Sequence, residues 1–578
     1  MALITSQNDI PRPSDERHSD ELSPNSSETH LTPNSDSDES DFEDLGEMGE
    51  SFMLQDRHAK TAEKEKPMDE EGDDGDGEDQ YTPRSGRRGS FSTVQSYQLY
   101  TPDEERAVIR KFDRKLVLFV ALLYMLSFLD RSSKFPSIST TDVLLRNEII
   151  DIGNAKIAGL DRDIHLDDAK YEWVITAFYI AYICFEWMSI LWKIIPAHIY
   201  VTIIVLSWGT VASLQAVTTS FAGLLVLRVL LGIGEAGFTG IPFYLSFFFK
   251  REEIALRVGF FISAAPLATS FASTLAWAIV KLGNKGPIAS WRLLFLLEGF
   301  PSILIAIFVW HIIPDSPSTA SYLTKRQKKV ARLRLRKQKC PSSKPGLNIS
   351  EMLRTLIDPK SYLTAFMFFL ANMAFSSMPV FLPTIIHEMG HSVLLSQALS
   401  APPYLASFLV VLLTSYLSDR FLSRSPFIIF HSLLSALGYS VIALGGYLHL
   451  SPWIRYVALY PANIGFFSVI TLIITWTINN QREESARGTG FAMLQLIGQC
   501  GPLVGTRLYP DRDKPFYVKG MAVCALAMVW VAVLASALRW WLGRCNRKNE
   551  GYGKLEEGEE RGLVRGEGRE EEEFRFLL

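Results

Sequence analysis

Cysteine is scarce in this sequence, and the few cysteines are scattered. The 578 residues include five, at positions 184, 340, 500, 524 and 545, with no C-x-x-C spacing between them. A disulfide framework or a metal site is therefore not expected. An early apolar run is also lacking, since the first hydrophobic segment starts at Lys115. That is too late for a cleaved signal peptide.

Large apolar residues are rare at both ends of the chain. Residues 1 to about 112 are rich in Ser, Asp, Glu and Pro, and the end of the chain is again highly charged. Such segments cannot bury enough apolar surface to fold. We therefore expect disordered cytoplasmic tails over 1–112 and 542–578. Two arginines precede Ser90, a candidate phosphorylation site for basophilic kinases, but motifs this short recur by chance and a solvated tail is the preferred interpretation.

Between these tails, apolar residues dominate and account for much of the 48% hydrophobic content. About a dozen segments near twenty residues long alternate with short polar breaks, which predicts an all-α polytopic membrane protein. The expected spans are 115–132, 171–192, 198–217, 221–246, 254–281, 292–313, 359–385, 396–417, 426–447, 452–477, 486–507 and 517–541. Six of these spans lie within 113–313 and six within 359–541.

Lysine and arginine gather in alternate loops, so the positive-inside rule places both termini in the cytoplasm. The densest cluster has nine basic residues between Lys325 and Lys339, inside the loop 314–358 that divides the first six spans from the last six. Such a cluster can bind nucleic acid or anionic lipid. An excess of basic residues is, however, typical of any cytoplasmic loop. We therefore expect a cytoplasmic helix here and no nucleic-acid partner.

Two short motifs have enzymatic counterparts. Gly232, Gly234 and Gly237 spell G-x-G-x-x-G, the dinucleotide-binding pattern, and residues 387–391 spell H-E-x-x-H, the zinc-protease pattern. The first needs a preceding strand and a soluble domain, which the sequence does not predict. The second needs a helix and a third ligand, but it falls at the end of a span with a glycine inside it. We therefore expect neither a cofactor nor a metal, and no enzyme.

The stretch Leu227 to Gly240, LRVLLGIGEAGFTG, carries two ionisable residues within an apolar span. Arg228 and Glu235 are seven positions apart, which places both on one face of a helix. Ionisable groups in the bilayer are costly unless they are paired or line a watery path, so they indicate a substrate or proton pathway. A structural ion pair is the alternative. The glycines of this stretch allow a neighbouring helix to approach closely.

Several segments together resemble a known family. They are IGNAKIAGLDRDI (152–164), FYIAYICFE (178–186), LRVLLGIGEAGF, SWRLLFLLEGFPS (290–302), IPDSP (313–317) and TRLYPDRDKPFYVKG (506–520). In this order they are similar to the fungal allantoate permease branch of the major facilitator superfamily, its anion:cation symporters. The resemblance covers about residues 110–545 and implies two six-helix bundles, over 113–313 and 359–541, that work by alternating access. It implies proton-driven uptake of a small organic anion, such as nicotinate, allantoate, pantothenate, biotin-type vitamins, or cysteine and other sulfur compounds.

The resemblance also implies roles for charged residues. Asp130 and Arg131 match the acid and arginine of the first helix in related organic-anion symporters, and Arg228 and Glu235 match those of the fourth. The arginines would orient the substrate carboxylate, and the acids would take up protons. Polar residues within apolar spans are further candidates for lining the substrate site, although each could instead hydrogen-bond between helices. These are Tyr179, Tyr182, Glu186, Asn372, Gln495 and Gln499.

The first span departs from the family pattern. The resemblance predicts Asp-Arg-Ser-Asn-Ile-Gly-Asn, but the chain continues from Ser132 with SKFPSISTTDVLLRNEIID before Ile152. Codons for Ser133 to Phe135 can contain a donor splice site, and codons for Ile150 and Asp151 an acceptor, so removing the segment restores the pattern. We hypothesise that residues 133–151 are a retained intron. A genuine external loop is the alternative.

The sequence thus predicts a monomeric, multi-pass transporter of the plasma membrane. Its partners are a small organic anion, protons and the lipid bilayer, and the proton gradient drives it without a cofactor. A non-transporting nutrient sensor of the same fold is the alternative function.

Overall fold

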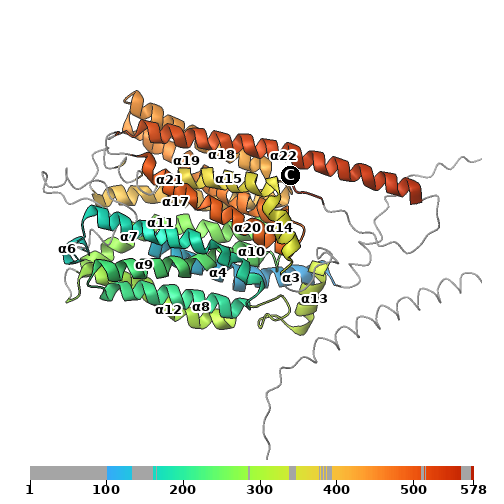
Figure 1. Cartoon of the computed structure of the whole chain (residues 1–578), viewed down its shortest axis with the longest axis horizontal. Coiled ribbons are helices and arrows are strands. Elements are labelled where there is room, and N and C mark those ends of the chain that lie inside the picture. Colours follow the sequence, from blue (N-terminus) through green and yellow to red (C-terminus); the bar gives the residue numbers. More distant parts are fainter. Residues whose placement is uncertain are drawn as a thin grey trace, which may run out of the picture. The chain divides into compact units, whose positions relative to one another are not determined.

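The computed structural model describes residues 100–132, 160–164, 166–283, 287–336, 347–376, 393–509, 516–560 and 575–578, with single residues 378, 382, 386 and 513. The suspect segment 133–151, the H-E-x-x-H motif and Ser90 lie outside these residues. Helices make up the described regular structure, which confirms the predicted fold class (Figure 1).

Six spans form the first half. They are α4 (Leu118–Ser132), α7 (Asp168–Phe185) with the 3-10 helix η3 (Glu186–Lys193), α8 (Ala197–Leu214) with η4 (Gln215–Val217), α9 (Phe221–Ala236) with η5 (Gly237–Gly240) and α10 (Ile241–Leu245), α11 (Ile254–Gly283) and α12 (Ser290–Ile312). The short α6 (Leu160–Ile164) precedes α7. Within this half α8 packs on α12, α7 on α9 and α11 on α4.

Six further spans form the second half. They are α15 (Pro359–Phe375), α17 (Val393–Arg420), α18 (Ser425–Tyr447), α19 (Pro452–Asn479), α20 (Glu484–Gly498) with α21 (Cys500–Gly505) and η6 (Thr506–Leu508), and α22 (Val518–Glu560). Here α18 packs on α19 and α22, and α15 packs on α20. Eight helices among the described residues are long and apolar enough to cross a membrane. The helices α4, α7, α15 and α20 occupy the places of the other four predicted spans.

Two helices extend into regions that we expected to be disordered. The first is α3 (Pro102–Phe112), which continues through the π-helical turn η1 (Asp113–Val117) into α4. Thr101 and Glu104 form a capping box at its start, each side chain bonding the other residue's backbone N–H. The second is α22, which continues to Glu560 instead of ending near 541. A membrane span ends where the sequence stops being apolar, but the helix can continue beyond that point, because Arg, Lys, Glu and Leu all favour helix.

The helices α3, α13 (Lys325–Arg336) and α14 (Ile349–Ile357) gather at one end of the molecule, which we call the basic end (Figure 1). There Glu105 accepts from Lys250 Nζ at 2.7 Å and from Arg334 Nε at 3.1 Å. Burial would raise the pKa of the Glu105 carboxyl, but its hydrogen bonds and ion pairs with Lys250 and Arg334 outweigh this and lower it below the usual value. Arg334 also pairs with Glu253. These pairings give part of the basic loop a structural role, which we did not predict from the sequence.

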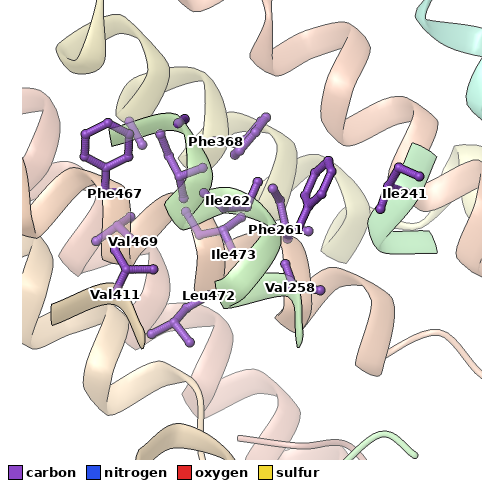
Figure 2. Packing of buried hydrophobic residues seen from close by; sticks show 14 of the residues in the cluster. Ile241, Val258, Phe261, Ile262, Phe368, Val411, Phe467, Val469, Leu472 and Ile473 are labelled. Carbon is purple, nitrogen blue, oxygen red and sulfur yellow. The ribbon is translucent and has the colours of Figure 1, made fainter. Parts of the chain in front are cut away.

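The two halves meet along α11, which packs on α17 and α19. Figure 2 shows part of this core, where Phe261 and Ile262 of α11 lie near Phe368 of α15 and Phe467 of α19. At the basic end polar contacts join the halves as well. Lys193 Nζ donates to Ser485 Oγ at 2.8 Å. The Asp419 carboxylate accepts from the first amides of α11, including Leu256 N at 2.8 Å, where the helix dipole favours a negative charge.

Candidate functional site

A cavity of about 100 Å³ lies between the two halves. It is smaller than the roughly 300–1,000 Å³ of most ligand pockets, so it suits a small molecule. Its lining comprises Tyr124, Phe128, Tyr179, Tyr182, Thr239, Pro242, Phe261, Ile262 and Ala265 of the first half, and Phe368, Asn372, Phe375, Ser376, Phe467, Ile470, Ile474, Gln495, Gln499 and Pro502 of the second.

The first half contributes mainly aromatic rings. Tyr179 and Tyr182 are three residues apart on α7, and Tyr124 and Phe128 four apart on α4, so each pair shares one face of its helix. The ring of Tyr124 stacks on Phe261 with centroids 4.3 Å apart. This half of the cavity is therefore a wall of packed rings that carries phenol hydroxyls.

The second half contributes amides. Asn372 lies on α15, and its Nδ2 donates to the Gly498 carbonyl at 3.3 Å, which joins α15 to the end of α20. Gln495 and Gln499 are four positions apart at the end of α20. Gln495 is nearly buried, and no described residue donates to its Oε1. A buried acceptor in this state costs about 1–3 kcal/mol, which a ligand that donates a hydrogen bond would recover.

Glu186 lies behind the cavity wall and is not among its lining residues. It begins η3, is fully buried, and its Oε2 lies 2.7 Å from Thr239 Oγ1, which does line the cavity. The same hydroxyl lies 2.8 Å from the Ala236 carbonyl. A hydroxyl has one hydrogen, so Thr239 donates to one of these two oxygens at a time.

Arg228 and Glu235 are both buried on α9, but neither lines the cavity. With Gly232 they follow one face of the helix at spacings of four and three. A Cβ atom on Gly232 would lie 2.6 Å from the Phe178 carbonyl and 3.1 Å from the Tyr182 amide, so this face meets the backbone of α7. The guanidinium of Arg228 also lies 5.6 Å from the Phe295 ring centroid on α12. The face of α9 that carries Arg228 and Glu235 thus lies next to α7, the helix that carries Tyr179 and Tyr182.

For two further predicted site residues, Asp130 and Arg131, the structure describes only the backbone. Asp130 and Arg131 belong to the last turn of α4, close in sequence to Phe128, and their side chains lie outside the described part of the structure. The glycine pattern at 232–237 lies within α9 and the start of η5, without the strand that dinucleotide binding requires. Among the described residues, no group of three His, Cys, Asp or Glu side chains could hold a metal ion.

Sequence reasoning missed Thr239 and most of the apolar lining, including Tyr124, Phe128 and Phe467. An apolar residue in a membrane helix gives no signal that separates a cavity wall from a lipid-facing surface or a packed core. The spacing of Tyr124 and Phe128 shows only that they share a face.

Known proteins agree with this architecture. Residues 120–506 match the family model described as Major Facilitator Superfamily. The chain is 31% identical to the MFS transporter prlL of a fungal species (strain NRRL 50135), over 80% of this chain and 94% of that protein. It is 28% identical to a high-affinity nicotinic acid transporter of Saccharomyces cerevisiae, over 72% of this chain and 74% of that protein.

Solved structures show the same fold at low sequence identity. The E. coli fucose:proton symporter FucP has a TM-score of 0.51 and 14% identity, covering 73% of this chain and 97% of that one. The proton:xylose symporter XylE has a TM-score of 0.55 and 13% identity, covering 73% and 95%. Because the family model spans more than half of the sequence and the fold agrees, the chain belongs to the major facilitator superfamily and is a secondary transporter, not an enzyme.

Proposed function

We propose that the chain is a proton-coupled importer of a small organic anion, with nicotinate as the first candidate substrate. The observation that carries this proposal is the cavity between the halves, which combines stacked rings with amides and phenols. Aromatic walls suit a planar ring, and the amide N–H groups of Asn372, Gln495 and Gln499 can donate to a carboxylate. The relative named as a nicotinic acid transporter supports the same chemistry.

The position of the cavity supports transport by alternating access. In major facilitator proteins the substrate site lies near the bilayer midplane between two halves that rock about it. Here both halves supply lining residues. The contacts at the basic end, such as Lys193 to Ser485, hold that end together. The positive-inside rule supports a cytoplasmic location for the basic end. We propose the plasma membrane as the membrane in which the protein resides.

Buried acids supply the proposed proton coupling. Glu186 and Glu235 are fully buried, and Asp130 lies in the last turn of α4. A buried carboxylate is costly as an anion, so it takes up a proton unless a positive charge compensates it. We propose that Glu235 on α9 exchanges the transported proton, that Glu186 holds one through Thr239, and that Arg131 and Arg228 balance the substrate's charge.

The test is uptake of labelled nicotinate, allantoate, pantothenate, biotin and cysteine in cells, at acidic and at neutral external pH. We expect one substrate to accumulate faster at acidic pH and Glu235→Gln to abolish that advantage. Asp103→Asn, which removes an exposed acid of α3, is the matched control. The panel includes a chain without residues 133–151, which tests the retained-intron hypothesis. Binding without uptake would instead support a sensor.

A further inference from the structure

The segment Arg575–Leu578 lies packed at the basic end, close to the point marked C in Figure 1. We expected it to be part of a disordered tail. Its side chains are partly buried from Phe576 onward, and each of its four carbonyls accepts a hydrogen bond from another part of the chain. A short segment bonded in this way is held as a bound peptide would be. We call the surface that holds it, formed by Lys360, Trp476, Asn480 and Asn546, the groove.

Two asparagines bind the backbone of the segment in the same manner. Asn480, just after α19, accepts from the Leu577 N–H at 2.9 Å and donates to the Leu577 carbonyl at 3.1 Å. Asn546 of α22 accepts from the Phe576 N–H and donates to its carbonyl, both at 2.9 Å. Each amide thus satisfies both polar groups of one residue, as a neighbouring strand would. Trp476 Nε1 adds a further bond to the Leu577 carbonyl at 2.8 Å.

Side chains of the segment also contact the rest of the protein. Phe576 and Leu578 pack against the hydrophobic core of the transporter. The ammonium of Lys360, at the start of α15, lies 4.6 Å from the centroid of the Phe576 ring, which is a cation–π distance. The four residues before Phe574 in the sequence are glutamates. Their charge favours attraction of this part of the chain to the basic end.

The segment also connects the two halves. In the first half, Arg251 donates from Nη2 to the Arg575 carbonyl at 3.2 Å. In the second half, Arg424 donates its backbone N–H to the Leu578 carbonyl, while its Nη2 donates to the Arg251 carbonyl at 3.1 Å. Arg424 is fully buried and paired with Asp419, whose carboxylate bonds the start of α11. The bound segment therefore extends the contacts that join the halves at this end.

We propose that the groove formed by Lys360, Trp476, Asn480 and Asn546 is an intramolecular peptide-binding site, and that Arg575–Leu578 is a latch that holds the basic end closed. With the latch bound, the halves separate at this end only after the hydrogen bond from Arg251 to the Arg575 carbonyl breaks. When it leaves, the closed arrangement keeps fewer contacts and opens more readily. The latch therefore sets the balance between the two access states, whichever substrate the cavity takes.

The first experiment tests occupancy in the full chain. Phe576 is replaced by the photoreactive p-benzoylphenylalanine, and the cross-linked peptides are identified by mass spectrometry. We expect cross-links within one chain to the start of α15 and to α22. Combining Asn480→Ala with Asn546→Ala removes hydrogen bonds to both residues and should lower the yield about tenfold or more. Asn549→Ala, one turn along α22, is the matched control. Cross-links between two copies, or none to these helices, would overturn the proposal.

The second experiment tests the effect on conformation without any substrate. Spin labels are placed at Arg110 of α3 and Arg547 of α22, both exposed, in a chain with its native cysteines replaced. Deleting residues 575–578 should shift the distances between the labels toward longer values, and the double asparagine variant should do the same. The Asn549→Ala variant should leave the distribution unchanged. A distribution that does not respond to the deletion would contradict the latch, whatever the uptake assay shows.

Discussion

Gln495 is a buried amide whose Oε1 receives no hydrogen bond from the described residues, although it lines the cavity. Substitution by leucine keeps the approximate volume and removes the amide. If the amide bonds the substrate, we expect Gln495→Leu to raise the KM for uptake about tenfold or more, because a charged or polar ligand loses its partner in a buried site.

The neighbouring Leu496 provides the control, since it is 44% exposed on the outer side of α20. Leu496→Ala should leave KM unchanged at equal surface expression. An unaltered KM in the Gln495→Leu variant would mean that the amide does not contact the substrate.

The sequence marked several cavity residues because a polar side chain within an apolar helix stands out. Tyr179, Tyr182, Asn372, Gln495 and Gln499 were proposed on that ground, and all five line the cavity. The same reasoning selected Glu186, which lies one contact behind Thr239. Polarity thus identifies the buried side of a membrane helix, but it does not separate the cavity wall from the residues that support it.

At the scale of the element, α9 depends on Gly232. A Cβ atom there would lie 2.6 Å from the Phe178 carbonyl, which is backbone and cannot turn away. Gly232→Ala should therefore push α9 and α7 apart and lower the free energy of unfolding by about 1–3 kcal/mol. Thermal unfolding of the purified protein measures this loss.

Gly543 of α22 is the matched site, because a Cβ atom there meets nothing within 4 Å. Gly543→Ala should leave the melting temperature unchanged or raise it slightly, since alanine favours helix over glycine by about 1 kcal/mol. Equal melting of the Gly232→Ala variant and the parent would show that the two helices do not touch at this point.

Helix positions were predictable because each span must be apolar for about twenty residues. Helix ends were less so. Residues beyond 541 are too polar for a span yet form helix as far as Glu560. The start of α3 had a readable signal in Thr101, Pro102 and Glu104, which form a capping box with proline at the first helical position. Composition over the whole tail concealed this local signal.

At the scale of the molecule, contacts between distant segments decide how the halves meet. Lys193 and Ser485 are 292 positions apart, and Asn480 and Leu577 are 97 apart. Periodicity describes one helix at a time, so neither contact is visible in it. The acidic composition of the end of the chain predicted disorder. Composition averaged over the tail does not show that its last four residues, three of them apolar, dock on the transporter.

The Lys193–Ser485 contact gives a direct test of how the basic end stays closed. Its hydrogen bond joins η3 of the first half to α20 of the second, next to the packing of these two elements. Removing the ammonium in Lys193→Ala should let the halves separate more often at this end. The amides of η3 and of the first turns of α20 should then exchange hydrogen faster, because local opening exposes them to water.

Lys170→Ala removes an exposed ammonium at the other end of α7 and serves as the control. If both variants exchange alike, the Lys193–Ser485 hydrogen bond does not help to hold the basic end closed. If Lys193→Ala alone exchanges faster, this polar contact contributes to the balance between the two access states.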